Sequence, residues 1–272
     1  ALPLRHLLAK YPQLAGHIDE VILGCANQSG EDNRNVARMA TLLAGLPEST
    51  PAVTVNRLCA SGLEAIGQGA RAIALGEADI ILAGGVESMS RAPYVMAKAL
   101  EGFERTQQLE DSTLGWRMIN PKMREAYGVD SMAQPAENLA EQFGISRSDQ
   151  DAFAWRSQQR AATAIADGRL DGEILSAGAL THDEHPRADT TLEKLAALKP
   201  ITHAGGSITA GNASGLNDGS TALLLASASA LEKYGLSPRA CIAGMASAGV
   251  APRRNSLPTS TVATSRTRIG TP

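Results

Sequence analysis

The chain has 272 residues, of which 43% are hydrophobic, 3% are aromatic and 26 are glycine. A chain of this length forms one large domain or two ordinary ones. Its composition favours an α/β enzyme with an aliphatic core. The formal net charge of −3 gives no electrostatic reason to expect nucleic acid or an anionic membrane as a partner.

Three widely spaced cysteines, Cys25, Cys59 and Cys241, cannot form a disulfide framework, and an odd number is typical of a reducing compartment. No stretch reaches the about 18 apolar residues that a membrane helix requires. The first residues also lack the pattern of a signal peptide. The sequence therefore predicts a cytoplasmic protein without a membrane partner.

The first part of the chain alternates helical and strand patterns. Apolar spacing predicts helices at residues 2–14, 35–44 and 59–75, and β-branched or apolar runs predict strands at 20–25, 52–56 and 79–83. The last strand is expected to end at the Gly84-Gly85 pair. Because short turns join these elements, we expect parallel strands linked by right-handed crossovers, which is α/β layering.

From about residue 88 to residue 216, short helices are joined by long polar connections. One helix is predicted at 134–143 and ends at Gly144, and a longer one starts from a cap on Ser146 or Ser148. Strands at 223–226 and 241–246 and a helix at 228–234 follow. Cys25 and Cys241 both lie in strand patterns among apolar neighbours, so we expect both in the core.

The sharpest local pattern is NRLCASGLEA at residues 56–65. Cys59 stands where a predicted strand ends and a helix begins. Backbone N–H groups and the positive end of the helix macrodipole favour the thiolate there, which is the reactive form. The small residues that follow it let a substrate approach the backbone. A buried, inert cysteine is the commoner case, but this position favours a nucleophile.

Other polar groups have simpler interpretations. The HDEH run at residues 182–185 offers four potential metal ligands, but it shares no helical or strand period and Pro186 follows it. A solvated loop and no metal site are therefore expected. Glu87 and Arg91 have two interpretations, a place along the approach to the active site and a role at a helix end or on the surface, and the second is favoured.

Three long motifs, in order, resemble the thiolase family: NRLCASGLEAI at 56–66, GEADIILAGGVESMSRAPYVM at 76–96 and ITAGNASGLNDGSTALLL at 208–225. The resemblance extends from about residue 2 to residue 252. Within the family, the segments 24–40, 114–132 and 183–200 are most similar to the 3-oxoadipyl-CoA (β-ketoadipyl-CoA) thiolases of aromatic degradation.

The resemblance implies a layered α/β/α fold with a mixed five-stranded sheet, an inserted loop domain and an incomplete C-terminal half. Residues 1–88 and 217–239 would form the N-terminal domain, 89–216 the loop domain, and 240–252 the start of the C-terminal domain. Residues 253–272 contain no acidic residue and no apolar period, which predicts a disordered tail.

The resemblance also implies a site. Cys59 matches the acyl-accepting cysteine, Ser214 matches a serine that contacts the pantetheine arm of CoA, and Ala210 lies on the same stretch. Arg187 and Met132 match positions near the bound CoA. Coenzyme A would be a substrate and no cofactor or metal is implied. The intact parent would be a homo-oligomer, a dimer or tetramer.

Thiolysis needs a thiolate that attacks the 3-keto carbon, and groups that transfer protons. The resemblance places these groups in a Gly-His-Pro segment and a Cys-x-Gly segment, and neither occurs in the 272 residues. We therefore expect a piece truncated at both ends, with an out-of-frame or misassembled 3′ end. Its turnover alone is expected to be negligible, because each lost proton-transfer group lowers the rate by roughly 10²–10⁴.

Two alternatives stay open at this point. One is a β-ketoacyl synthase-like condensing enzyme, against which the AGNASGLNDG stretch at 210–219 and the inserted loop domain argue. The other is a non-catalytic CoA-binding fragment. Alkylation of Cys59 distinguishes a preserved acylation site from an inert thiol.

Overall fold

The computed structural model describes residues 1–252 and the backbone of 259–265. The chain forms two compact units, each described here by itself. Unit 1 holds residues 1–113 and 218–249 with the strand at 259–265, and unit 2 holds residues 114–217 with the described part of 250–258. The first boundary thus falls after Thr113, whereas the sequence places a domain boundary after Ser88.

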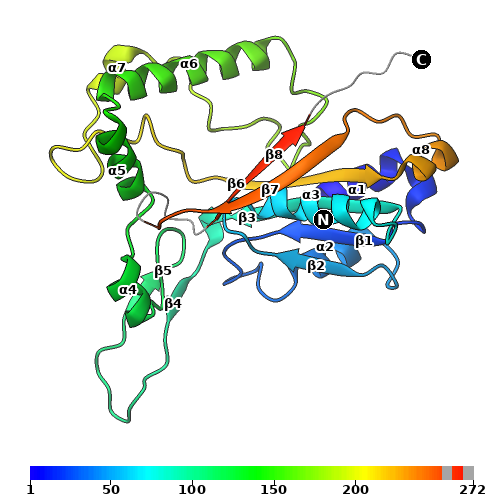
Figure 1. The fold of residues 1–272 in the computed structure, drawn as a ribbon, viewed down its shortest axis with the longest axis horizontal. Helices are drawn as coiled ribbons and strands as arrows, with labels where there is room; N and C mark the ends of the chain where they lie inside the picture. Colours follow the sequence, from blue (N-terminus) through cyan, green and yellow to red (C-terminus); the bar gives the residue numbers. More distant parts are fainter. Residues whose placement is uncertain (253–258, 266–272) are drawn as a thin grey trace. The chain divides into compact units, whose positions relative to one another are not determined.

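Unit 1 is built on one mixed sheet (Figure 1). Its strands are β1 (Glu20–Gly24), β2 (Ala52–Val55), β3 (Ile80–Ser88) and β6 (Asp218–Ala226), in the order β2-β1-β3-β6. Strand β1 runs parallel to β2 and β3, and β6 is antiparallel to β3. The predicted mixed α/β sheet is confirmed, with four strands in the described residues where the resemblance implies five.

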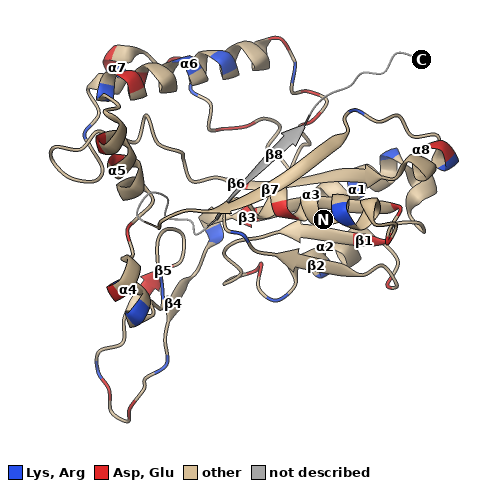
Figure 2. Ribbon diagram, viewed as in Figure 1, with Lys and Arg blue, Asp and Glu red and all other residues tan. Residues whose placement is uncertain are grey.

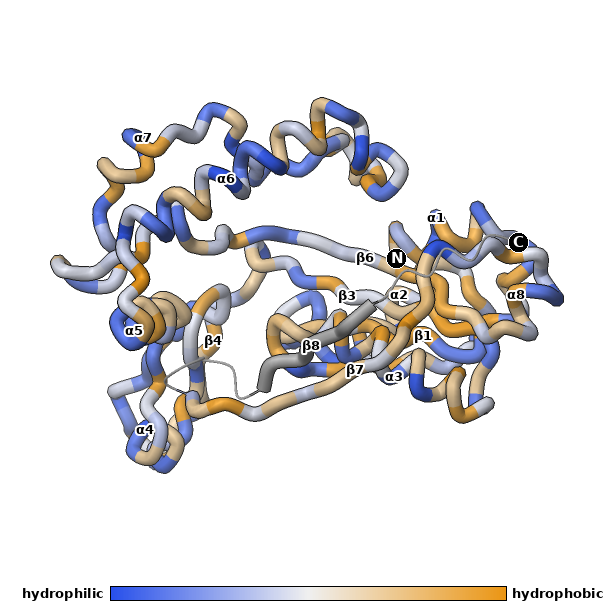
Figure 3. Tube along the Cα trace, turned by 45° about the horizontal axis from the view of Figure 1, so that its top comes forward, coloured by the Kyte–Doolittle hydropathy of each residue, from blue (hydrophilic) through white to orange (hydrophobic). Residues whose placement is uncertain are grey.

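Helices cover both faces of this sheet. They are α1 (Leu2–Lys10), which is followed by a 3₁₀ turn at Pro12–Leu14, and α2 (Val36–Ala44), α3 (Ser61–Ala74) and α8 (Ala228–Tyr234). Side chains alternate along a strand. Val21 and Leu23 therefore join a core with α1, α2 and α8, while Ile22 joins the core under α3. Hydrophobic residues concentrate along β1 and the adjoining helices (Figure 3).

Strand β3 continues past the Gly84-Gly85 pair, where the sequence predicts that it ends. A Cβ on Gly84 would lie 2.1 Å from the carbonyl oxygen of Thr221 on β6. Glycine is therefore what lets the two backbones approach, and the pairing extends to Ser88 opposite Asp218. The Gly84-Gly85 pair therefore allows β3 to continue beside β6 and does not end the strand.

Two further antiparallel pairs belong to unit 1. Strands β4 (Tyr94–Met96) and β5 (Leu109–Asp111) form a hairpin after the 3₁₀ turn Met89–Arg91. Strand β7 (Ile242–Gly249) pairs with β8 (Thr259–Ser265). Figure 2 shows β7 without charged residues.

Two expectations at this end of the chain are wrong. Residues 259–265 of the expected disordered tail form β8, because β7 offers unpaired backbone groups to a stretch rich in Thr, Ser and Val. Residues 253–258 and 266–272 lie outside the described residues. Cys241 is exposed, not in the core, because β7 is exposed along most of its length.

Unit 2 is helical. It contains α4 (Pro121–Tyr127), α5 (Ala133–Phe143), α6 (Arg147–Ala166) and α7 (Leu192–Ala196). As predicted, Gly144 ends α5 in the left-handed conformation and Ser146 caps α6, its hydroxyl accepting from the Asp149 N–H at 3.1 Å. None of the helices in the described part of the chain combines the length and apolar character needed to cross a membrane.

The core under the sheet can be tested by truncation. Leu82 is 1% exposed on β3, whereas Leu75 at the end of α3 is 74% exposed. Leu82→Ala should lower the free energy of unfolding by about 2–5 kcal/mol through lost burial and a residual cavity. Leu75→Ala should change it by less than about 0.5 kcal/mol. Urea unfolding followed by circular dichroism measures both, and equal effects would contradict this packing.

Candidate active site around Cys59

Cys59 lies in the turn between β2 and α3, and its side chain is exposed. Helix α3 begins at Ser61 with Ala60 as its N-cap. Cys59 therefore precedes the helix, whereas the sequence predicts that the helix starts at Cys59. The residue before it, Leu58, has φ of 52°. A bulky residue in this left-handed region is uncommon and strained, and such strain is concentrated at functional sites.

Two polar side chains hold the turn in this shape. Asn56 accepts from the Leu58 N–H at 2.8 Å and donates to the Ala26 carbonyl at 3.0 Å. Ser61, which is buried, accepts from the Arg57 N–H at 2.8 Å and donates to the Leu58 carbonyl. The sequence interpretation gave these residues no such role, although Asn and Ser around a turn are a signal for local side-chain bonds to the backbone.

A buried carboxylate ties the turn to the next turns of α3. Glu64 Oε2 lies 2.9 Å from Arg57 Nε, and its Oε1 lies 3.0 Å from Arg71 Nη2 and 3.1 Å from Gln68 Nε2. The contact with Arg57 is an ion pair by distance but lacks hydrogen-bond alignment. Burial alone would raise the pKa of Glu64, but the hydrogen bond from Gln68 and the positive charges of Arg57 and Arg71 lower it overall.

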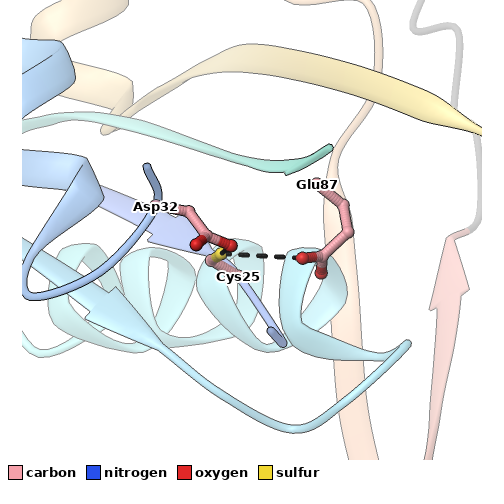
Figure 4. A group of neighbouring side chains, drawn as sticks. All are labelled: Cys25, Asp32 and Glu87. Carbon is pink, nitrogen blue, oxygen red and sulfur yellow. Dashed lines mark hydrogen bonds between the residues drawn. The ribbon is translucent and has the colours of Figure 1, made fainter. Parts of the chain in front are cut away.

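A second thiol, Cys25, contrasts with Cys59. It is buried, as predicted, and its Sγ lies 3.4 Å from Asp32 Oδ2 and 3.8 Å from Glu87 Oε1 (Figure 4). Burial, followed by the charges of Glu87 and Asp32, raises the pKa of Cys25 to about 12. The thiol therefore stays protonated and is not a nucleophile at neutral pH.

The two carboxylates of this cluster fix the loop after β1. Glu87 accepts from the Ala26 and Asn27 N–H groups at 2.9 and 3.1 Å. Asp32 accepts from those of Gln28 and Gly30 at 3.1 and 2.9 Å. Within residues 1–252, these side chains form the single group of metal-ligand type, but backbone donors already occupy their oxygens. Glu87 is thus a loop-holding residue on β3 and not at a helix end or on the surface.

The remaining polar residues behave as the sequence predicts. Arg91 is exposed and pairs with exposed Glu31. Residues 182–185 are all exposed, which confirms the solvated loop.

The residues expected near CoA lie in unit 2, whereas Cys59 lies in unit 1. Met132 is the N-cap of α5, and the side chains of Arg187, Ala210 and Ser214 are exposed. The backbone N–H of Arg187 donates to Gln158 on α6 at 2.8 Å. Their grouping with Cys59 in one site stays a prediction.

Contacts within unit 2 bring the segments that carry these residues together. A Cβ on Gly215, next to Ser214, would lie 2.2 Å from the ring of His185. A Cβ on Gly211, next to Ala210, would lie 2.5 Å from Leu195 and Leu198. The 210–215 stretch therefore packs directly against the 185–198 stretch.

The sheet, the strained turn and the exposed thiol define a layered α/β protein that presents a cysteine at a strand–helix junction. The model of the family described as "Thiolase, N-terminal domain" matches residues 3–229. The chain therefore belongs to the thiolase family.

Curated relatives and solved structures agree with this assignment. The chain is 60% identical over 262 residues to the beta-ketoadipyl-CoA thiolase of Pseudomonas aeruginosa, covering 93% of this chain and 65% of the relative. It is 57% identical to the 3-oxoadipyl-CoA/3-oxo-5,6-dehydrosuberyl-CoA thiolase of Escherichia coli, covering 93% and 66%. The chain thus spans about two thirds of the length of these relatives.

Two crystal structures share the fold. Human mitochondrial 3-ketoacyl-CoA thiolase in complex with CoA matches with a TM-score of 0.83 and 36% identity, over 93% of this chain and 64% of that one. The acetyl-CoA acetyltransferase of Bacillus anthracis matches with a TM-score of 0.80 and 37% identity, over the same shares. These matches do not favour the condensing-enzyme alternative.

The contact between β1 and the start of α3 can be tested at Gly24. A Cβ there would lie 2.3 Å from the Ser61 carbonyl carbon and 2.5 Å from the Gly62 nitrogen. Gly24→Ala should therefore push the helix start away, lower the free energy of unfolding by about 1–3 kcal/mol and change the alkylation rate of Cys59. Gly16→Ala is the matched control, since nothing lies within 4 Å of its Cβ. Identical behaviour of the two variants would refute the role of this contact.

Proposed function

We propose that this chain carries the acyl-accepting part of a thiolase site and that Cys59 forms the acyl-enzyme. The observation that carries the proposal is the exposed thiol on a strained turn that precedes α3. Free N–H groups and the positive dipole end at a helix start favour a nearby anion. Cys25, by contrast, is buried and protonated.

The chemical step follows from the thiolate. The Cys59 sulfur attacks the 3-keto carbon of a 3-oxoacyl-CoA, and the oxygen of that carbonyl becomes an oxyanion. When the carbonyl re-forms, the bond between the α and β carbons breaks and acetyl-CoA leaves as an enolate that takes up a proton. The acyl group stays on sulfur as a thioester, and the thiol of a second CoA accepts it, which returns the thiolate.

We further propose 3-oxoadipyl-CoA as the substrate, which would give a succinyl-enzyme and then succinyl-CoA. The names and identities of the Pseudomonas aeruginosa and Escherichia coli relatives support this choice. The CoA part would contact Met132, Arg187, Ala210 and Ser214. A CoA complex of a solved relative with 36% identity supports CoA as a substrate.

Turnover by this polypeptide alone is expected to be negligible. The 272 residues contain no Gly-His-Pro and no Cys-x-Gly, the segments that would supply the general base and acid. Each missing group lowers the rate by roughly 10²–10⁴. Acylation of Cys59 is the part of the reaction that these residues can still perform, slowly.

We also propose that the protein is cytoplasmic and that the intact parent is a homo-oligomer. Three free cysteines fit the reducing cytoplasm. An intact homo-oligomer is supported by the β4–β5 hairpin, where Tyr94, Met96 and Leu109 are 69%, 59% and 66% exposed, because exposed apolar groups mark interfaces.

Alkylation tests the nucleophile directly. In a Cys241→Ser background Cys59 is the one exposed thiol, since Cys25 is buried. Iodoacetamide should label it roughly tenfold faster at pH 7 than it labels the free thiol of N-acetylcysteine. Acetyl-CoA should slow the labelling, and mass spectrometry of the peptide that contains Cys59 measures both rates. Labelling at the rate of the free thiol, unaffected by acetyl-CoA, would defeat the proposal.

A further inference from the structure

Glu137 is a buried carboxylate with no role in the chemistry described above. It lies on α5, five positions after Met132, and is 8% exposed. Its oxygens accept hydrogen bonds from groups of one short segment, residues 202–208. Among the described residues, its hydrogen-bond partners include no basic side chain, and N–H and O–H dipoles balance its charge.

The bonds to this segment are numerous and short. Oε1 accepts from the Thr202 hydroxyl at 2.7 Å and from the Ser207 and Ile208 N–H groups, both at 2.8 Å. Oε2 accepts from the Ser207 hydroxyl at 2.7 Å and its N–H at 3.0 Å. Burial alone would raise the pKa of Glu137, but these donors lower it to about 2. The carboxylate is therefore ionised at neutral pH and binds the segment strongly.

The fixed segment leads directly into the stretch that the proposed function assigns to CoA. Residues 200–209 form a narrow loop, closed by a bond from the Ile201 N–H to the Ile208 carbonyl at 2.9 Å. Thr209 is fully buried at its end, and exposed Ala210 follows at once. The position of Ala210 thus depends on the segment that Glu137 holds.

A second set of hydrogen bonds, made by Asn212, fixes the residues that follow this segment. Asn212 accepts from the Thr209 N–H at 2.7 Å and donates to the Ser207 carbonyl and to buried Asp151 on α6, both at 3.0 Å. Asp151 is paired with Arg147 at 2.8 Å. Because the Asn212 amide is used by these bonds, it serves the loop and leaves contact with a ligand to Ala210 and Ser214.

We propose that Glu137 is a positioning residue for CoA: its carboxylate holds the 202–208 segment against α5 and so sets where Ala210 and Ser214 lie relative to Met132. This inference rests on the proposed function, since it assumes that these residues bind CoA. Glu137 itself touches no reacting atom.

The test measures CoA binding and the reactivity of Cys59 separately. In the Cys241→Ser background, the concentration of desulfo-CoA that halves the alkylation rate of Cys59 reports binding, and the rate without ligand reports the thiol. Glu137→Gln replaces one acceptor oxygen by an NH₂ group that faces the Ser207 donors. It should raise the half-protecting concentration roughly tenfold and leave the rate without ligand unchanged.

Two further variants keep the test decisive. Glu141→Gln, exposed on the same helix, should change neither quantity. Thr202→Val removes one hydroxyl donor without changing the backbone, and should raise the half-protecting concentration a few-fold even if Glu137→Gln fails to fold.

Each outcome has one meaning. Unchanged protection in Glu137→Gln and Thr202→Val overturns the positioning role, and so does an equal change in the rate without ligand, which indicates general unfolding. If desulfo-CoA does not protect Cys59 even with Glu137 intact, CoA binding and thus the proposed function fail first.

Discussion

The start of α3 lies so close to the end of β1 that a single methyl group at Gly24 would overlap the Ser61 backbone. This contact places the turn that carries Cys59 at the carboxyl end of the parallel strands, where α/β proteins bind ligands. Asn56 then joins the turn to the Ala26 carbonyl, and Glu87 holds the Ala26 N–H. The cluster of buried Cys25 with half-buried Asp32 and Glu87 therefore supports the shape of the turn that carries Cys59.

The same physical logic recurs in unit 2. There a buried carboxylate, Glu137, is neutralised by backbone and hydroxyl donors and fixes a loop whose next residues are exposed. In both units the exposed groups proposed to meet substrate are short or small, such as Cys59, Ala210 and Ser214. In this proposal, buried polar residues one or two contacts away fix the positions of these small groups. Small side chains and backbone placed in this way can bind a thin ligand.

Much of this fold follows from local sequence. The apolar run at Glu20–Gly24 and the caps at Gly144 and Ser146 appear where the patterns place them. The predictions that are wrong concern features set by partners distant in sequence. The length of β3 depends on its pairing with β6, and the exposure of Cys241 depends on what covers β7. Cys59 is proposed as the nucleophile from its position between strand and helix, which the sequence alone indicates and the structure shows as an exposed turn. The roles of Glu64 and Glu137 were not predicted from the sequence, because their partners and burial are set only by the folded chain.

Acyl transfer to Cys59 is the central claim, and the most direct measurement is the mass of the cysteine peptides after the chain is incubated with acetyl-CoA. The account predicts one acetyl group on the peptide that contains Cys59, formed slowly, and none on those of Cys25 or Cys241. Absence of acetyl on Cys59, or equal acetylation of the exposed Cys241, would contradict it, because the turn before α3 would then confer no special reactivity.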